Sequence, residues 1–600
     1  WRTVLPADQQ RFAHESMAIA TREWPWLAGM GWAIDQPAAA PSDPLWGFAF
    51  NADLADALSN AGVDRPARPE HGTSTRSMWW SALQIIGLGI VVWRSQSAAR
   101  HLPWLRWAQQ YRRLSPITQG GIWAVLAGLY FVAQWPPLIA LCLGVAALLM
   151  LAAPHCGLWL ALVLLPFHIF HKELAFGPET LLLPPTQALL VAGLPALYLS
   201  VRRRTARASP FGIIARLRRR TTDVATVDVI AVCWLGVSIL AAANVWYWPA
   251  YWQGMADLVV GPLVLYLMIR LWGENRTVLT GAMYALFVGG ALAASFGLFM
   301  WLQGAGTTAD AVRRLVGPHF SPNHSALYFV RTFFLGLGLT AAAVFAWQRQ
   351  PASTTTIRLV AGGCLTAMVG GALLLTASRG ALLLGVPAGI VTFLWLSRSA
   401  PTTSSGSRLG RHVPGATKQV QFLVLVAVVV AMMGLGWMFR VRLANSDTIM
   451  ARLDIWQTAL ALWRTYPWAG VGPGGFFWRF PAAIPMGAAI DPNLRHPHNI
   501  WLELATGWGI SGLVWIGATL AVVAKFARTA SGLARPQSVH LAQAGLLAGL
   551  AAGFAHGQVD AWMTLADLAA WNWTALALLT SFMAGTKKRG ASSMTDDTPR

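Results

Sequence analysis

TVLTGAMYALFVGGALAASFGLFMWL, residues 277–302, is a run without a single charged side chain. About 20 apolar residues in a helix cross the hydrocarbon core of a bilayer, so this run predicts a transmembrane helix. Working outward from it, we count fifteen runs of this kind in the chain. They are 78–93, 119–135, 137–153, 157–170, 181–201, 226–246, 257–272, 277–302, 323–347, 359–376, 380–397, 420–439, 499–524, 541–559 and 562–583.

The composition agrees with this pattern. Apolar residues make up 55% of the 600 residues and charged residues only 12%, whereas a soluble domain carries about 25% charged residues. So few charges exclude a water-soluble enzyme and a disordered scaffold. The sequence therefore predicts an all-α polytopic membrane protein with about 14–15 transmembrane helices. The pair of runs around Trp135-Pro136-Pro137 could also form one re-entrant element, and residues 157–170 are short for a span.

The chain is strongly basic, with a formal net charge of +21. A basic balance can indicate nucleic-acid binding, but in a membrane protein Lys and Arg in short loops first mark the cytoplasmic side. With fifteen spans, the five basic segments fall on the same side; they are 94–118, 202–225, 398–419, 525–540 and the tail 586–600. We therefore expect a multi-pass protein of the plasma (inner) membrane with its C-terminus in the cytoplasm and no nucleic-acid partner. Residues 1–76 and loops 303–322 and 440–498 are then extracytoplasmic.

The four cysteines show no metal or disulfide pattern. They lie in or beside apolar runs, without a CxxC pair, and so indicate neither a disulfide framework nor a zinc site. They are Cys142, Cys156, Cys233 and Cys364.

The large outer loop 440–498 carries more arginine than its topology explains. The guanidinium fork matches phosphate geometry, so an outer arginine cluster suits a polyanionic ligand; alternatively, these side chains snorkel at the membrane interface. The charged residues are Arg440, Arg442, Arg452, Arg464, Arg479 and Arg495 against Asp447, Asp454 and Asp491.

Within this loop, three shorter patterns follow one another. Apolar residues at helical spacing over 448–466 predict an amphipathic helix at the membrane surface, ended by Pro467. The glycines of 470–475 permit tight turns and close backbone approach, whereas a dinucleotide-binding loop would need a surrounding βαβ unit. His496 and His498 follow; they could be interfacial residues or bind a metal, but no carboxylate–histidine cluster is visible to complete a metal site.

Two further outer segments bring positive charge to the same side. Arg379, between two apolar runs, is costly there unless it has a partner or a task, or else it snorkels at a helix end. Residues 313–324 contribute more arginines and histidines. In a folded bundle the three outer segments could converge on one site.

The polar motifs of these segments form an ordered series along the chain. The series is Gly317 with Pro322-Asn323, Ser378-Arg379-Gly380, Arg452 with Trp456, Pro467, Gly470-x-Gly472-x-Gly474, His498-Asn499, Gly507-x-Gly509-x-x-Gly512 and His556-x-x-x-Asp560. In order, spacing and sidedness it resembles the superfamily of O-antigen ligases and O-antigen polymerases. The resemblance covers about residues 119–583.

This resemblance implies an enzyme, a glycosyltransferase or ligase without metal or other cofactor. Such proteins move a glycan from an undecaprenyl-diphosphate carrier to an acceptor hydroxyl on the outer face. The implied partners are a polyprenyl-diphosphate-linked glycan donor, a glycan, lipid or protein acceptor, and membrane lipid; ligase and polymerase are not separated. Direct displacement would invert the anomeric carbon.

The resemblance also implies site residues. His498 would take the acceptor proton, a role that suits imidazole near neutral pH, and Arg379 would act beside it in stabilising the diphosphate. The diphosphate would be bound by Arg313, Arg314, Arg452 and Arg495. Further candidates are His319, Asn323, His324, Gly472, Gly474, Asn499, His556 and Asp560.

A polytopic transporter, or a lipid-carrier flippase for cell-surface polysaccharide, is the alternative. Such proteins show internal repeats and ionisable residues near the membrane midplane. Here the runs are nearly free of charge and the polar groups gather on one side. This distribution favours a surface-facing enzyme.

The start of the chain shows a different resemblance. Residues 7–24 predict a helix and 27–34 a short strand, and residues 43–50 with 65–69 look like the last unit of a (β/α)₈ glycoside hydrolase. An unrelated extracytoplasmic cap is the alternative. Since Trp1 opens the chain, we expect most of that domain to lie upstream, and we assign it no catalytic residue.

The predicted domain layout follows from these assignments. It comprises a glycoside hydrolase-like remnant at 1–76, an anchoring helix with its basic loop at 77–118, a ligase-like membrane domain at 119–585 and a cytoplasmic tail at 586–600.

Overall fold

The computed structural model describes two long parts of the chain. These are residues 104–398 without 177–178, 206–221, 274 and 310–311, and residues 447–593 without 486–487, 489, 533–535 and 562; Gly434 is also described. The chain divides into two compact units, Trp1–Trp104 and Leu105–Arg600, and apart from Trp104 the described residues fall in the second. The predictions for residues 1–76, for the runs 78–93 and 420–439 and for residues 594–600 lie outside the described residues.

The described residues are built almost wholly from helices. The α-helices are α4 (Trp104–Arg113), α5 (Pro116–Val132), α6 (Pro136–Ala152), α7 (Pro154–Val163), α8 (Pro185–Thr205), α10 (Thr222–Leu240), α11 (Trp248–Gly254), α12 (Gly261–Trp272), α13 (Arg276–Leu302), α14 (Pro322–Arg349), α15 (Ser353–Leu375), α16 (Val386–Arg398), α19 (Asp447–Thr465), α20 (Phe476–Arg479), α21 (Ile500–Gly532), α22 (Gln537–His556) and α23 (Ala566–Ser593). Short 3₁₀ or π turns are η1 (Leu165–Phe167), η2 (Ala241–Asn244), η3 (Met255–Val260), η4 (Ala381–Gly385) and η6 (Phe480–Ala483).

Two antiparallel hairpins are the strand structure of the described residues. The first pairs β1 (Lys172–Phe176) with β2 (Glu179–Leu183), and the second pairs β3 (Thr307–Ala309) with β4 (Val312–Arg314). In the second hairpin Thr308 lies opposite Arg313. The hairpin therefore ends with two consecutive arginines, whose side chains point to opposite faces.

Seven described helices are long and apolar enough to cross a membrane, which confirms the all-α polytopic class. They are Thr226–Asn244, Trp248–Trp272, Arg276–Leu302, Pro322–Arg349, Ser353–Leu375, Ile500–Arg528 and Gln537–His556. Four shorter apolar helices are Pro116–Val132, Pro136–Ala152, Pro154–Val163 and Ala381–Ser397.

Prolines set several boundaries that the apolar runs alone place differently. The runs on either side of Trp135 are two separate helices of 17 residues each, because the residue before a proline prefers extended backbone. The run 157–170 is α-helical only to Val163, since Pro166 follows. The run 181–201 begins as strand β2, and its helix starts at Pro185.

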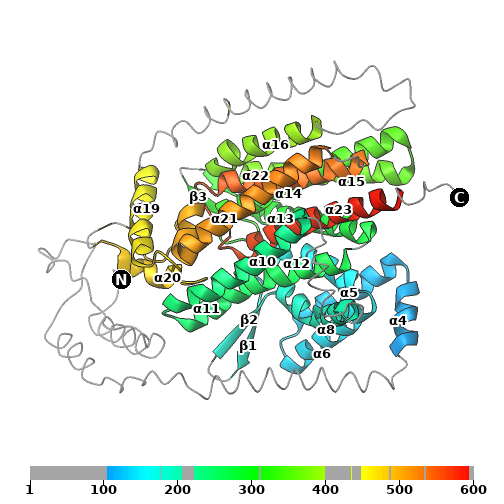
Figure 1. Cartoon of the computed structure of the whole chain (residues 1–600), viewed down its shortest axis with the longest axis horizontal. Helices are drawn as coiled ribbons and strands as arrows, with labels where there is room; N and C mark the ends of the chain where they lie inside the picture. Colours follow the sequence, from blue (N-terminus) through cyan, green and yellow to red (C-terminus); the bar gives the residue numbers. More distant parts are fainter. Residues whose placement is uncertain are drawn as a thin grey trace, which may run out of the picture. The chain divides into compact units, whose positions relative to one another are not determined.

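Small residues let the central helices approach closely. In Figure 1, α14 and α22 run side by side with α16. A Cβ atom added to Gly338 of α14 would lie 2.8 Å from the Cα atom of Gly545 in α22. Such glycine contacts are typical of helix packing within membranes, where van der Waals contact replaces the hydrophobic effect.

One end of this bundle collects the predicted site segments. The backbone N–H of Leu315 donates to the carbonyl of Leu375 at 2.9 Å, and the N–H of Ile500 donates to the carbonyl of Gly557 at 2.8 Å. The residue after β4 therefore lies beside the end of α15, and the start of α21 lies beside the end of α22. The predicted helix 448–466 is confirmed as α19, which packs against α21 near this end (Figure 1).

Candidate active site

Two strained backbone positions mark the site. Among the described residues other than glycine, Ala377 and His498 have positive φ, at 47° and 52°. Non-glycine residues in this region cost about 1–3 kcal/mol each and persist only where the surroundings hold them. Both residues belong to predicted site segments, the turn 376–380 and the outer loop.

A polar cavity opens beside the first of these turns. Three arginines from three separate segments reach it: Arg314 from β4, Arg379 from the turn 376–380 and Arg452 from α19. The full lining is Arg314, Asn323, Ala377, Ser378, Arg379, Gly380, Arg452, His556, Val559 and Asp560. Three guanidinium groups against one carboxylate give the cavity a positive balance.

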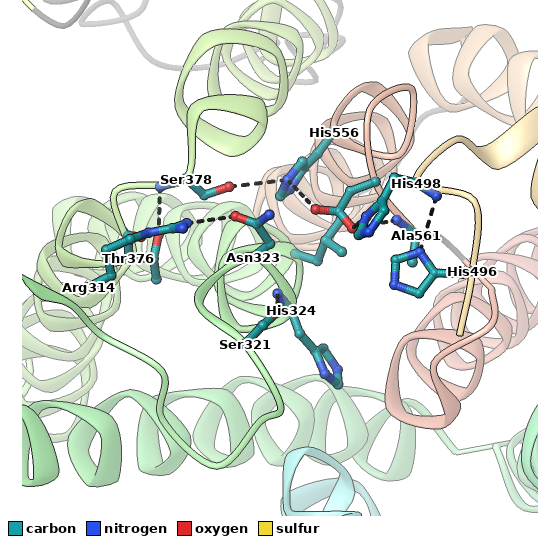
Figure 2. A network of polar contacts seen from close by, with 12 residues as sticks. Arg314, Ser321, Asn323, His324, Thr376, Ser378, His496, His498, His556 and Ala561 are labelled. Carbon is teal, nitrogen blue, oxygen red and sulfur yellow. Dashed lines mark hydrogen bonds and ion pairs between the residues drawn. The ribbon is translucent and has the colours of Figure 1, made fainter. Parts of the chain in front are cut away.

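Arg314 holds two walls of the cavity together. Its Nε donates to the carbonyl of Thr376 at 2.8 Å, and its Nη2 donates to Oδ1 of Asn323 at 2.7 Å (Figure 2). These bonds connect β4, the turn 376–380 and the start of α14. Arg314 therefore has a structural task as well as a charge that faces the cavity.

His556 forms the centre of the polar network. In Figure 2 it lies between Ser378 on one side and His498 on the other. Its Nε2 is 3.3 Å from Oγ of Ser378 and 3.9 Å from Oδ2 of Asp560. Both contacts use the same ring nitrogen, whereas a serine–histidine–acid relay needs opposite nitrogens. This arrangement therefore does not activate Ser378 as a nucleophile.

Gly380 leaves room for His556. A Cβ atom added to Gly380 would lie 2.6 Å from Cδ2 of His556. A glycine after Arg379 therefore allows the turn to close over the histidine.

His498 contacts Asp560 through one carboxylate oxygen, and His556 lies near the other. The two side chains meet through Nδ1 and Oδ1 at 3.2 Å, with 26% of the His498 side chain exposed and 4% of the Asp560 side chain. A carboxylate at Nδ1 fixes the ring and leaves the lone pair on Nε2 to accept a proton. His498 does not line the cavity itself; it reaches the cavity through Asp560.

The electrostatics around Asp560 keep it ionised. Burial by itself raises the pKa of this carboxyl, but the hydrogen bond from His498 and the nearby His556 and His496 hold it well below its usual range. Burial and the neighbouring His498 lower the pKa of His496 to about 3. Near pH 7, Asp560 is therefore ionised and His496 is neutral.

The expectation that no carboxylate completes a histidine cluster is wrong. Donor atoms of His496, His498 and Asp560 lie within 4.8 Å of one another. The carboxylate comes from a position 62 residues further along the chain, so local spacing could not reveal it. These three residues could hold a divalent cation of the kind that accepts nitrogen and oxygen ligands.

His319 and His324 belong to a second, buried cluster. Nε2 of His324 lies 2.8 Å from Oδ1 of Asp567, and Nε2 of His319 lies 3.5 Å from Oδ2 of the same carboxylate. These donor atoms also lie within 4.8 Å of one another. Burial, and next the neighbouring His324, lower the pKa of His319 to about 4.

Asn499 caps a helix. Its Oδ1 accepts the N–H of Trp501 at 2.9 Å and of Leu502 at 3.1 Å, and its Nδ2 donates to the carbonyl of Gln558. It thereby satisfies the first turn of α21 and ties it to the turn after α22. These hydrogen bonds fix the backbone directly after His498 in the described structure.

Gly472 and Gly474 allow close backbone contact, as their spacing predicts. Their φ angles are +85° and +77°. A Cβ atom on Gly474 would lie 2.4 Å from the carbonyl oxygen of Ala250, and the N–H of Gly472 donates to the carbonyl of Gly507 at 2.9 Å. The glycine-rich loop thus packs against α11 and the kinked start of α21, and it does not line the cavity.

Arg313 and Arg495 lie on aromatic rings outside the cavity lining. The guanidinium of Arg313 is 4.4 Å from the ring centre of Trp301, and that of Arg495 is 5.4 Å from the ring centre of Phe320. The structure therefore brings Arg314, Arg379 and Arg452 together but not these two.

The sequence patterns indicate no role for Asp567, Glu503 or Arg331. All three are buried polar residues within or at the start of apolar helices. The sequence signal for such residues is an ionisable side chain within an apolar run, because a charge is costly in a membrane span.

Among the comparisons with known proteins, a family model matches a part of the chain. No curated protein matches the chain. The matched segment of the family model contains the turn 376–380, Arg452, His498 and Gly509, and it supports a glycan-transfer role at a membrane. Residues 364–517 match the family model described as O-antigen ligase.

Proposed function

We propose that this protein transfers a glycan from a polyprenyl-diphosphate carrier to an acceptor hydroxyl on the outer face of the plasma membrane. One observation carries the proposal: three arginines line one cavity together with Asp560, the carboxylate that pairs with His498. The acceptor is a glycan, a lipid or a protein side chain. Residues 119–585 form the transferase domain in this proposal.

The arginines stabilise the leaving group. When the bond between the anomeric carbon and the phosphate oxygen breaks, negative charge grows on the diphosphate. Arg314, Arg379 and Arg452 come from three segments and can surround it, and guanidinium groups bind phosphate oxygens through paired hydrogen bonds. Charges placed in advance at the leaving group lower the barrier without a metal.

His498 acts as the general base. The acceptor oxygen attacks the anomeric carbon, the acceptor proton moves to Nε2 of His498, and the polyprenyl diphosphate leaves with the electron pair of the broken bond. Asp560 at Nδ1 orients the ring and stabilises the imidazolium that forms. A single displacement of this kind inverts the anomeric carbon.

The test is a transfer assay with purified protein in lipid nanodiscs and undecaprenyl-diphosphate-linked glycan. We expect His498→Ala and Arg379→Ala to lose transfer by at least about a hundredfold. The matched control is Arg495→Ala, which removes an arginine of the same outer end that faces an aromatic ring. Full transfer by both His498→Ala and Arg379→Ala would refute the mechanism, and movement of the donor across the bilayer without bond formation would indicate a transporter.

A further inference from the structure

Asp567 is a buried acid in the first turn of α23, outside the cavity lining. Its side chain is 3% exposed. A carboxylate that is removed from water is costly unless hydrogen-bond donors or positive charges surround it. The side chains that it contacts therefore show which part of the molecule it holds in place.

A histidine at the start of α14 supplies the closest of these contacts. Nε2 of His324 lies 2.8 Å from Oδ1 and 2.9 Å from Oδ2 of Asp567. An ionised carboxylate accepts hydrogen bonds and cannot donate them, so the proton of this imidazole lies on Nε2. His324 is the third residue of α14, and 243 positions separate the two side chains along the chain. Helix α23 thus holds the first turn of α14 through a buried hydrogen bond.

The segment just before this turn is held by the same acid and by the turn itself. Nε2 of His319 lies 3.5 Å from Oδ2 of Asp567, and its Nδ1 lies 3.1 Å from Oγ of Ser325. Oγ of Ser321 accepts the backbone N–H of His324 at 3.2 Å, which caps the helix. This segment and the first turn therefore form one block around the acid.

The neighbouring residue of this turn reaches the cavity. Oδ1 of Asn323 accepts from Nη2 of Arg314 at 2.7 Å, and both residues line the cavity. In Figure 2, Asn323 points toward Arg314, whereas the side chain of His324 extends in a different direction. The two adjacent side chains therefore connect the buried acid with a cavity arginine.

We infer that Asp567 is a positioning residue for transfer, which acts on Arg314 through His324 and Asn323. The hydrogen bond to His324 fixes the first turn of α14, and the fixed turn presents Oδ1 of Asn323 to the guanidinium group. This inference rests on the proposed function, in which Arg314 stabilises the leaving diphosphate. A displacement of a catalytic group by about 1 Å can cost about a hundredfold in rate, so an acid outside the cavity can affect transfer strongly.

The test uses the same nanodisc transfer assay, with kcat counted per folded molecule. We expect Asp567→Leu, which removes the acceptor for His324, to lower kcat/KM for the donor about tenfold to a hundredfold. Asp567→Asn keeps an oxygen acceptor at the same place and should stay within threefold of the wild type. The matched control is Asp257→Leu, which removes another aspartate that contacts a histidine, at 3.5 Å from Nε2 of His168, outside the cavity lining. It should also stay within threefold.

A second measurement separates positioning from a general loss of stability. Substitutions of residues that act through one contact are not additive, whereas substitutions at independent sites add. Asp567→Leu should therefore cause no further loss in an Arg314→Ala background, because the arginine that it positions is absent. In an Arg452→Ala background it should cause its full loss, because Arg452 comes from α19.

Four outcomes of these assays overturn the inference. They are full transfer by Asp567→Leu, equal losses in Asp567→Leu and Asp567→Asn, an equal loss in Asp257→Leu, and a full further loss in the Arg314→Ala background. Elemental analysis adds a fifth, since a metal ion bound by the wild type and absent from Asp567→Leu would make the acid a metal ligand. If Asp567→Leu does not fold, His324→Phe decides, because it keeps a flat ring and removes Nε2; full transfer there also refutes the role.

The same assay separates this inference from the proposed function. Full transfer by Asp567→Leu alongside lost transfer in His498→Ala refutes the inference alone. Full transfer by both His498→Ala and Arg379→Ala refutes the proposed mechanism itself.

Discussion

Two groups of arginines lie at the same end of the bundle and differ in what their guanidinium groups face. Arg314, Arg379 and Arg452 line one cavity. Arg313 and Arg495, with Arg479, lie over aromatic rings at 4.4–5.4 Å from the nearest ring centres. The first group shares one cavity, where Arg314 also donates to the carbonyl of Thr376 and to Asn323, whereas each member of the second lies over an aromatic ring.

The difference shows that the number of arginines at this end of the bundle says little about the ligand. A guanidinium over an aromatic ring gains about 0.5–1 kcal/mol at an exposed site and anchors a loop. Guanidinium groups that share a cavity repel one another, so their convergence needs a compensating anion. In the proposed reaction the donor diphosphate is that anion, and Asp560 contributes one negative charge to the same cavity.

The largest difference between the two groups is expected for Arg452 and Arg495, which both follow residue 446. We expect Arg452→Ala to lower kcat by about 10²–10³, the usual loss when one donor to a developing charge is removed. Arg452→Lys should recover only a part, because an ammonium lacks the planar fork. The measurement is initial transfer rate at saturating donor.

Arg495→Ala is the matched control and should change kcat less than threefold. If both variants lost the same activity, the distinction between cavity-lining and ring-stacked arginines would have no functional meaning.

Much of this fold could be predicted from the sequence, because apolar run length reports directly on transmembrane helices. The amphipathic pattern over 448–466 gave α19 to within a residue or so at each end. The helix boundaries differ from the predicted runs at prolines, since Pro166 and Pro185 set helix boundaries inside apolar runs.

The site could be predicted only in part. Motif residues named the cavity arginines, but nothing local separates Arg313 from Arg314; the register of a short hairpin decides which one turns inward. The pairing of His498 with Asp560 spans 62 positions and depends on how α21 and α22 meet. One charge hardly changes the hydropathy of a long apolar run, so the run pattern does not single out Arg331.

A second prediction sharpens the role of Asp560. Asp560→Asn removes the charge that orients His498, and we expect kcat to fall about tenfold to a hundredfold, a part of what a positioned general base contributes. Asp560→Glu should fall less, because it keeps the carboxylate. Transfer rate at fixed pH measures the effect.

The matched control is Asp491→Asn, which alters an exposed outer aspartate that accepts the N–H of Asn493. A loss in Asp491→Asn as large as that in Asp560→Asn would mean that the outer loop, and not the pair with His498, limits transfer.

A third prediction concerns acid stability and the buried side of the site. Burial lowers the pKa of His319 to about 4, whereas an exposed histidine titrates near about 6.5. The unfolded chain therefore binds a proton first, and the stability from a neutral His319 is complete above about pH 6.5 and is lost as the pH falls toward 4. Between pH 7 and pH 4.5 this loss is about 2 kcal/mol.

His319→Gln removes the titrating group, so its free energy of unfolding should fall by about 2 kcal/mol less than that of the wild type over the same range. Denaturant titration in detergent at the two pH values measures this difference. His171→Gln, at an exposed position, should behave as the wild type does. Equal acid sensitivity of His319→Gln and the wild type would contradict the prediction.

The smallest expected effect is that of removing divalent cations. His496, His498 and Asp560 have the donor atoms for a cation, but three guanidinium groups already supply positive charge to the neighbouring cavity. A cation on Nδ1 of His498 would also replace Asp560, the group that stabilises the imidazolium. We therefore expect dialysis against EDTA to change the transfer rate less than twofold. Loss of transfer with recovery on adding Zn²⁺ or Mg²⁺ would make His498 a metal ligand, and the cavity arginines would then assist a cation that neutralises the diphosphate.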